Sequence, residues 1–254
     1  MTKFSVAVVI LVQLLIVGDI RAHEKCQCDC TASKDSEEYK AFQEDFDSLR
    51  DHCKANFSDV RTIPLACKLQ TSMEKFNKYD SPEDFKKYEN LKNKLPLNVQ
   101  KLIWGKKSHL INKSYPTEYL YAVDESEEDT QNRRIFSWIP GGWHSQGVWV
   151  FIPQNSGKSF LIQSNQYNQY LCPGSEGSKH DANRRRCFVR HTSSTEDCQW
   201  IVEILDNDEL KIKSKKFNEY LYAASFGHDE ERRFVFAYNQ SGECDDSCIW
   251  KLKF

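Results

Sequence analysis

Paired arginines recur three times in this sequence, and they are the residues best suited to bind an anion. They are Arg133-Arg134, Arg184-Arg185 and Arg232-Arg233. A guanidinium fork matches a sulfate, phosphate or carboxylate with two parallel hydrogen bonds, so one interpretation is a patch for a sulfated glycan or a phospholipid head group. The other is that each pair forms salt bridges with the acidic loop just before it. We favour this structural role because the formal net charge is -2 at pH 7, but both interpretations stay open.

Two tryptophans that have no counterparts elsewhere in the chain form a second candidate site. Trp138 and Trp143 flank a Pro-Gly-Gly turn. Aromatic side chains in a loop can stack on a sugar ring or enter a lipid surface, and they can equally plug one end of a barrel. With the six arginines, they are our candidate ligand-binding residues.

The sequence offers few candidate catalytic residues. The histidines are scattered, and the sequence contains no His-Glu-x-x-His motif, no Gly-x-Ser-x-Gly motif and no phosphate-binding glycine loop. Near the N-terminus, Cys26, Cys28 and Cys30 alternate in a pattern that could hold a soft metal, but no matching Cys-x-x-Cys pair follows. We therefore expect no enzyme activity, no cofactor and no metal.

The first 22 residues predict export. Lys3 is followed by an apolar run from Phe4 to Gly18 and by the small residue Ala22, which is typical of a signal peptide and short for a membrane span. All ten cysteines follow it, so we expect a secreted, extracellular protein without integral membrane insertion and with disulfide bonds. The disulfide candidates are Cys26, Cys28, Cys30, Cys53, Cys67, Cys172, Cys187, Cys198, Cys244 and Cys248.

Five cysteines lie before residue 100 and five after it, so pairing within each half cannot be complete. Either one disulfide joins the halves or one thiol in each stays free. Cys172 and Cys187 fall on consecutive strands of an expected hairpin, and they are our predicted local pair. Cys244 and Cys248 could close a small loop.

Three sequons, at Asn56, Asn112 and Asn239, are glycosylation candidates in a secreted chain. Asn239 falls in a predicted turn, whereas Asn112 lies near a strand. Because the exported chain is slightly acidic, we expect no nucleic-acid partner.

A repeat of about fifty residues must position these groups. Tyr119, Tyr170 and Tyr220 are 51 and 50 residues apart, and the same spacing separates the tryptophans Trp149, Trp200 and Trp250. Each unit offers four short runs of β-branched and aromatic residues bounded by turn residues. Three units of four strands predict a closed β-trefoil over residues 101–254.

The segment before the repeats has helical periodicity. An apolar stripe follows a capping residue at Asp35, a second helix is expected to begin at Pro64, and a third at Pro82. The segment Leu95–Asn98 is expected to end this part. The predicted fold is α+β: a signal peptide (1–22), a cysteine-containing helical domain (23–100) and a β-trefoil (101–254), the two domains packed together.

Specific strings in the repeats resemble a known family. A helical segment, then LPLNVQKLIWG, then strands carrying INKSYPTEYLYA, SNQYNQYLCP and SKKFNEYLYA are similar to the insect low-molecular-weight haemolymph lipoproteins, the thirty-kilodalton, microvitellogenin-like class. The resemblance covers about residues 85–254. It implies a helical domain followed by a β-trefoil, secretion into haemolymph, and storage or transport with binding of lipid or glycan.

The closing-strand tryptophans also resemble those of ricin-type lectins, but the glutamine two residues earlier is replaced by Gly147, Cys198 and Cys248, so a galactose site of that type is not expected. The leading hypothesis is a secreted, non-enzymatic binding protein for lipid or glycan. The alternative is a secreted salivary or immune effector that binds a protein partner, which the many cysteines suggest.

Overall fold

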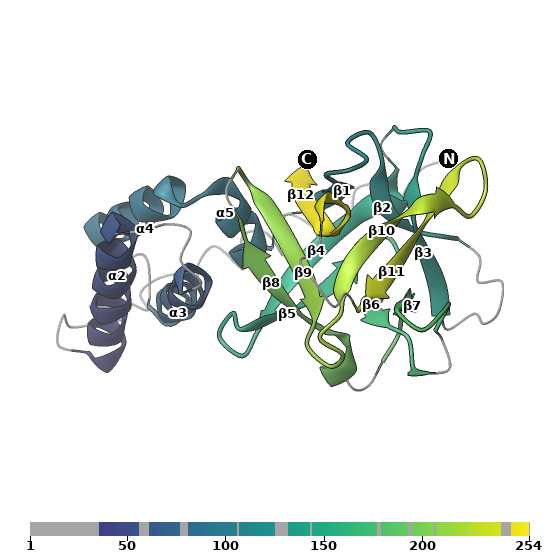
Figure 1. Cartoon of the computed structure of the whole chain (residues 1–254). Coiled ribbons are helices and arrows are strands. Elements are labelled where there is room, and N and C mark those ends of the chain that lie inside the picture. Colours follow the sequence, from purple (N-terminus) through teal and green to yellow (C-terminus); the bar gives the residue numbers. More distant parts are fainter. Residues whose placement is uncertain are drawn as a thin grey trace, which may run out of the picture.

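The computed structural model describes residues 36–55, 61–76, 81–105, 107–124, 132–142, 144–176, 179–192, 195–205, 207–239 and 245–253. The helices gather at one end of the molecule and the strands form the larger, other part (Figure 1). The predicted signal peptide and the candidates Cys26, Cys28, Cys30, Asn56, Trp143 and Cys244 lie outside the described residues.

Four helices precede the strands in the described chain: α2 Glu37–Ala55, α3 Thr62–Lys75, α4 Pro82–Lys94 and α5 Leu97–Ile103. The predicted stripe of α2 is buried at Phe42, Phe46, Leu49 and Cys53, because residues three and four apart share one helix face. Helix α3 begins two residues before Pro64, which lies in the first turn, where a missing N–H does no harm. Helix α4 begins at Pro82 as predicted.

Helix α5 differs from the sequence prediction, which ends the helical part at Leu95–Asn98. Pro96 instead immediately precedes the first helical residue of α5, where its ring is tolerated. The short helix buries Val99, Leu102 and Ile103. The Lys101 ammonium donates to the carbonyl oxygen of Leu252 at 2.8 Å, so α5 is tied to the last strand.

Twelve strands, paired antiparallel, follow in the described residues. In chain order they are β1 Ser108–Asn112, β2 Tyr119–Ala122, β3 Asn132–Trp138, β4 Val148–Gln154, β5 Ser159–Ser164, β6 Tyr170–Pro173, β7 Arg184–Arg190, β8 Gln199–Ile204, β9 Glu209–Ser214, β10 Tyr220–Gly227, β11 Arg232–Tyr238 and β12 Ile249–Lys253. Strands β3, β7 and β11 each pair with the other two, so this set of strands closes on itself. The result is a trefoil-like fold.

The three closing-strand tryptophans occupy equivalent surroundings. Trp149, Trp200 and Trp250 are fully buried. Their indole N–H groups donate to the carbonyl oxygens of Leu120, Leu171 and Leu221 at 2.9, 2.8 and 2.8 Å, in each case 29 residues earlier. Because a buried indole N–H needs an acceptor, each bond fixes the indole in the core.

Helices α3 and α5 pack on the hairpin formed by β4 and β5. Gly157, at the tip of this hairpin, has a φ of +79°, and a Cβ atom placed there would lie 2.6 Å from Cys67 Sγ on α3. Only a glycine allows both the backbone conformation and the close approach of α3.

The predicted Cys172–Cys187 disulfide is wrong. Cys172 is bonded to Cys198, and Cys187 is a buried free thiol, as are Cys53 and Cys67. The register explains the error: Cys172 lies opposite Phe188 and Cys187 lies opposite Pro173. A shift of one residue turns side chains to opposite faces of a sheet, so Cys187 points into the core and Cys172 toward the cluster of Leu161 and Cys198. Cys248 is also disulfide-bonded.

Candidate functional site

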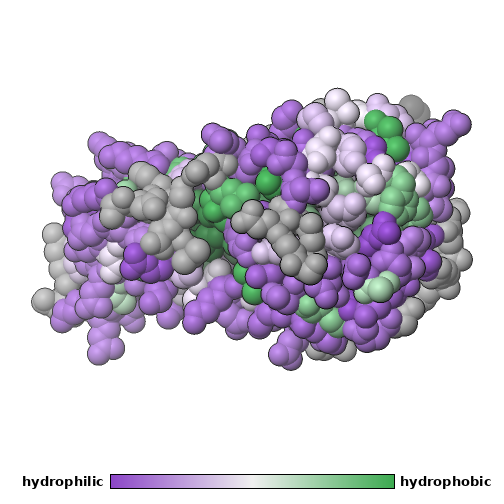
Figure 2. All heavy atoms as spheres, viewed as in Figure 1, coloured by the Kyte–Doolittle hydropathy of each residue, from purple (hydrophilic) through white to green (hydrophobic). Residues whose placement is uncertain are grey.

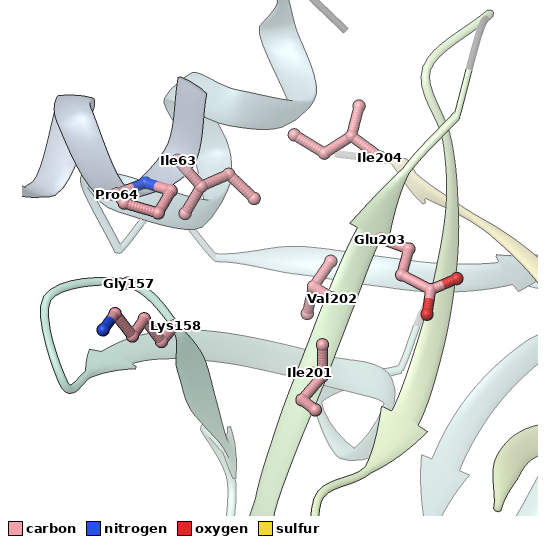
Figure 3. Close-up of a pocket in the computed structure, with 8 residues that line it drawn as sticks. All are labelled: Ile63, Pro64, Gly157, Lys158, Ile201, Val202, Glu203 and Ile204. Carbon is pink, nitrogen blue, oxygen red and sulfur yellow. The ribbon is translucent and has the colours of Figure 1, made fainter. Parts of the chain in front are cut away.

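An apolar pocket of about 230 Å³ lies between the helices and the barrel (Figure 3). Its lining comes from the first turn of α3, the β4–β5 hairpin and strand β8, and consists of Ile63, Pro64, Gly157, Lys158, Ile201, Val202, Glu203 and Ile204. In the space-filling view, hydrophobic atoms are visible in the hollow between the two parts of the molecule (Figure 2).

Local structure explains how these residues meet. Pro64 fixes the first turn of α3, and the buried Ile63 points across the pocket toward β8 (Figure 3). Alternate residues of a strand face the same side, so Val202 and Ile204 belong to one face of β8, and both pack against the main core. Gly157 keeps the hairpin close to α3 and thereby closes the side of the pocket near Lys158.

The two charged lining residues leave the pocket apolar. Glu203 points away from α3 (Figure 3), forms a salt bridge with Lys213 at 3.3 Å and accepts a hydrogen bond from the Tyr220 hydroxyl. Lys158 is exposed on the hairpin side. The remaining lining is mostly branched aliphatic side chains, which disfavour a strongly polar ligand because its desolvated polar groups would lack partners there.

A larger open groove of about 680 Å³ lies beside α5 and contains the exposed Leu97. Two of its lysines form salt bridges within the protein. Lys113 is 3.1 Å from Glu209 and 3.0 Å from Asp246, and Lys251 is 3.2 Å from Glu209. This groove is therefore a weaker candidate than the pocket beside α3.

The candidate arginines do not form one patch. Arg185 is 2% exposed, and its Nε and Nη2 donate to the two carboxylate oxygens of Glu219 at 2.8 and 3.0 Å. Arg233 makes the same two-bond contact with Glu118, both bonds at 2.8 Å. Glu219 and Glu118 each come from another repeat, which the sequence analysis does not predict. Arg185 Nη2 also donates to Glu176 at 2.8 Å, and Glu176 belongs to the loop just before Arg185, as predicted.

The strand register also changes which arginines are equivalent. The equivalent residues Tyr119, Tyr170 and Tyr220 lie opposite Trp138, Arg190 and Tyr238, respectively. The residues five positions before these three partners are Arg133, Arg185 and Arg233, which are therefore equivalent. Each donates to a carbonyl oxygen, of Val123, Gly174 and Ala224 respectively, and lies over an aromatic ring, of Tyr167, Phe217 and Tyr115.

Arg184 and Arg232 do pair with the loop just before them. Arg184 Nε donates to Asp181 at 2.6 Å, and Arg232 forms the matching contact with Asp229 at 2.5 Å. Arg134 lies over the ring of Phe136, with 5.5 Å from its guanidinium carbon to the ring centroid.

Trp138 is partly buried and packs against a hydrophobic cluster that includes Tyr121 and Phe136. Its indole N–H donates to the carbonyl oxygen of Gly141 at 3.0 Å, and its ring meets Tyr121 edge-on at 5.4 Å. Of the sequons, Asn239 is exposed. Asn112 is fully buried and donates to the Ser247 carbonyl oxygen at 2.7 Å, which argues against a glycan at that position.

Sequence reasoning missed the pocket beside α3. Its residues lie at positions 63–64, 157–158 and 201–204 and are mostly apolar, and only the packing of α3 on the barrel brings them together. Across the described ranges, the structure contains no group of three or more His, Cys, Asp or Glu side chains arranged to hold a metal ion. None of the described helices is long and apolar enough to cross a membrane.

Comparisons with known proteins show no family for this chain. No protein-family profile and no curated protein matches the chain. Among solved structures, the chain is similar to the designed threefold protein ThreeFoil, with 11% identity, a TM-score of 0.47 and coverage of 58% of this chain and 98% of that one.

Two further structures are similar to the chain. A Culex quinquefasciatus salivary protein of the cysteine- and tryptophan-rich family has 16% identity, a TM-score of 0.44 and coverage of 59% and 92%. A Polyporus squamosus lectin has 14% identity, a TM-score of 0.45 and coverage of 58% and 48%. All three are β-trefoil-like, and none is a haemolymph lipoprotein.

Proposed function

We propose that this chain is a secreted, non-enzymatic binding protein and that the pocket between α3 and β8 holds the aliphatic chain of a lipid or fatty acid. The proposal includes an N-terminal helical domain, a three-repeat β-trefoil and a storage or transport role of the kind found in haemolymph lipoproteins. The Cys172–Cys198 disulfide fits an extracellular location.

The observation that carries the proposal is the lining of the pocket. Ile63, Ile201, Val202 and Ile204 surround a space of about 230 Å³ where two structural layers meet. Burying an alkyl chain there removes apolar surface from water on both sides, at about 25 cal/mol per Å². Lys158, on the rim, offers a cation to a terminal carboxylate.

Titration of the purified full-length secreted chain with decanoic acid, followed by calorimetry, tests the proposal. We expect saturable one-site binding. The variant Ile204→Trp places an indole in the pocket and should weaken binding at least ~10-fold, a loss of about 1.4 kcal/mol. The control is Ile139→Trp, since Ile139 is also partly buried but does not line the pocket.

Unchanged affinity in Ile204→Trp, or no heat with decanoic, palmitic or lysophosphatidylcholine ligands, would overturn the lipid proposal. In that case, capture of a defined protein from the fluid that contains the chain would favour the alternative, a secreted effector with a protein partner.

A further inference from the structure

A separate pocket, which shares no residue with the pocket beside α3 or the groove beside α5, lies where the β6–β7 loop meets strands β10 and β11. Its volume is about 350 Å³, and it is lined by Asp181, Ala182, Asn183, Arg184, Tyr222 and Tyr238. Two aromatic rings and several hydrogen-bonding groups therefore share one small hollow, a lining unlike the aliphatic one beside α3.

Two tyrosines form the aromatic side of this pocket. On the paired strands β10 and β11, Tyr222 lies opposite Phe236 and Tyr220 opposite Tyr238. Tyr222 and Tyr238 are therefore diagonal neighbours on one face, and their ring centroids are 4.9 Å apart. Both side chains are half-buried. They offer an apolar ring face together with hydroxyl groups that can donate and accept hydrogen bonds.

The loop at Asp181 forms the polar side. One Asp181 carboxylate oxygen accepts hydrogen bonds from the backbone N–H groups of Asn183 and Arg184 at 3.0 and 2.9 Å, and the other accepts from Arg184 Nε at 2.6 Å. These bonds hold the loop in place. The charges of Asp181 and Arg184 offset each other, so this ion pair adds no net charge to the pocket. The Arg184 guanidinium keeps further N–H donors.

The same place in the first repeat is packed differently. There, Tyr121 and Trp138 correspond to Tyr222 and Tyr238 by strand register. The loop pair Asp229–Arg232 corresponds to Asp181–Arg184, and Arg232 lies opposite Trp138 as Arg184 lies opposite Tyr238. Tyr121 is only 6% exposed and belongs to a hydrophobic cluster that Trp138 covers. The larger indole fills space at the position that Tyr238 occupies in the third repeat.

We propose that the pocket of Tyr222 and Tyr238 binds a neutral sugar unit, free or at the end of a glycan. A pyranose has an apolar face that matches a tyrosine ring, and hydroxyl groups that need both donors and acceptors at fixed positions. The neutral Asp181–Arg184 pair and the two tyrosine hydroxyls supply them. This site differs from the ricin-type one, which depends on a glutamine two residues before the closing-strand tryptophan, where this chain has Gly147, Cys198 and Cys248.

Saturation-transfer NMR with the wild-type chain and glucose, galactose, mannose and N-acetylglucosamine tests the inference. We expect transfer to at least one sugar with a Kd of ~1 mM. The variant Tyr238→Trp copies the first repeat and should abolish transfer. Tyr220→Trp, on the same hairpin but outside the pocket, should bind like the wild type. Near-ultraviolet circular dichroism checks that both variants are folded.

Absence of transfer to all four sugars overturns the inference, as does equal transfer in Tyr238→Trp and the wild type. Transfer only to charged sugars such as N-acetylneuraminic acid, with none to the neutral panel, also overturns it. The Ile204→Trp variant should keep full sugar binding, so failure of the lipid proposal and failure of this one can be distinguished.

Discussion

The three equivalent arginines have nearly the same surroundings but differ in charge compensation. Arg185 and Arg233 each face a glutamate, Glu219 and Glu118. At the equivalent place opposite Arg133, the residue is Gln169. Within the described residues, neither Arg133 Nε nor Gln169 Oε1 has a hydrogen-bond partner.

The comparison separates two roles of the surroundings. All three guanidinium groups lie over a ring, at 4.2, 3.7 and 3.6 Å for Arg133, Arg185 and Arg233, and each donates to a main-chain carbonyl oxygen. The ring and the carbonyl group therefore place the arginine, whereas the carboxylate compensates its charge. Arg185 is nearly buried, so its positive charge depends most on a neighbouring carboxylate.

The largest effect is expected at Arg185. Glu219→Gln leaves a nearly buried guanidinium without its main counter-charge and should lower the free energy of unfolding by about 3 kcal/mol, measured by urea denaturation. Glu176 also contacts Arg185, at 2.8 Å, but is 69% exposed, so Glu176→Gln is the matched control and should change stability little. Equal losses in both variants would contradict the assignment.

The second effect is smaller because Arg233 is more exposed, 14% against 2% for Arg185. Glu118→Gln should cost about 2 kcal/mol in the same urea experiment, since water can partly solvate the remaining charge. A loss larger than that of Glu219→Gln would show that burial does not set the order.

The third prediction has the opposite sign. Gln169→Glu completes the pattern at Arg133 and should raise the free energy of unfolding by about 1 kcal/mol. In a double-mutant cycle with Arg133→Gln, Gln169→Glu should no longer raise the free energy of unfolding, which isolates the interaction between residues 133 and 169. Destabilisation by Gln169→Glu alone would mean that Arg133 is already compensated.

The smallest effect concerns a local pair. Burial alone would raise the pKa of Asp181, but the N–H groups of Asn183 and Arg184 and the guanidinium of Arg184 hold it below its usual value. A lowered folded-state pKa adds stability above the usual aspartate pKa of about 3.9, and this stability is lost as the pH falls through the folded-state value. Asp181→Asn should thus lower the melting temperature slightly at pH 7, and the difference should shrink toward pH 3. A difference that grows on acidification would contradict this.

The trefoil-like fold could be predicted from the sequence because its landmarks keep their spacing. Trp149, Trp200 and Trp250 fill one role in each unit, so their period survives in the sequence. The arginines do not keep it. Loops of different length separate the arginines from the tyrosines. Aligning the Arg-Arg motifs makes Arg133 equivalent to Arg184, whereas the strand register makes it equivalent to Arg185.

The disulfide and the pockets could not be predicted for a similar reason. Adjacent strands suggested Cys172 with Cys187, but one residue of register decides which face a side chain takes. The pocket beside α3 joins Ile63 to Val202, which are far apart in the chain, and no periodicity links them. Helix α5 was missed because seven residues after a proline carry too little periodicity to identify a helix.

The most direct test of the central claim is methyl NMR of the isoleucine-labelled chain during addition of decanoic acid. We predict saturable shifts of the Ile63, Ile201 and Ile204 methyl signals, with the signals of Ile135 and Ile162 in the barrel core unchanged. Shifts confined to other isoleucines, or no shifts at saturating decanoic acid, would contradict the claim that the space between α3 and β8 is a binding site for an aliphatic chain.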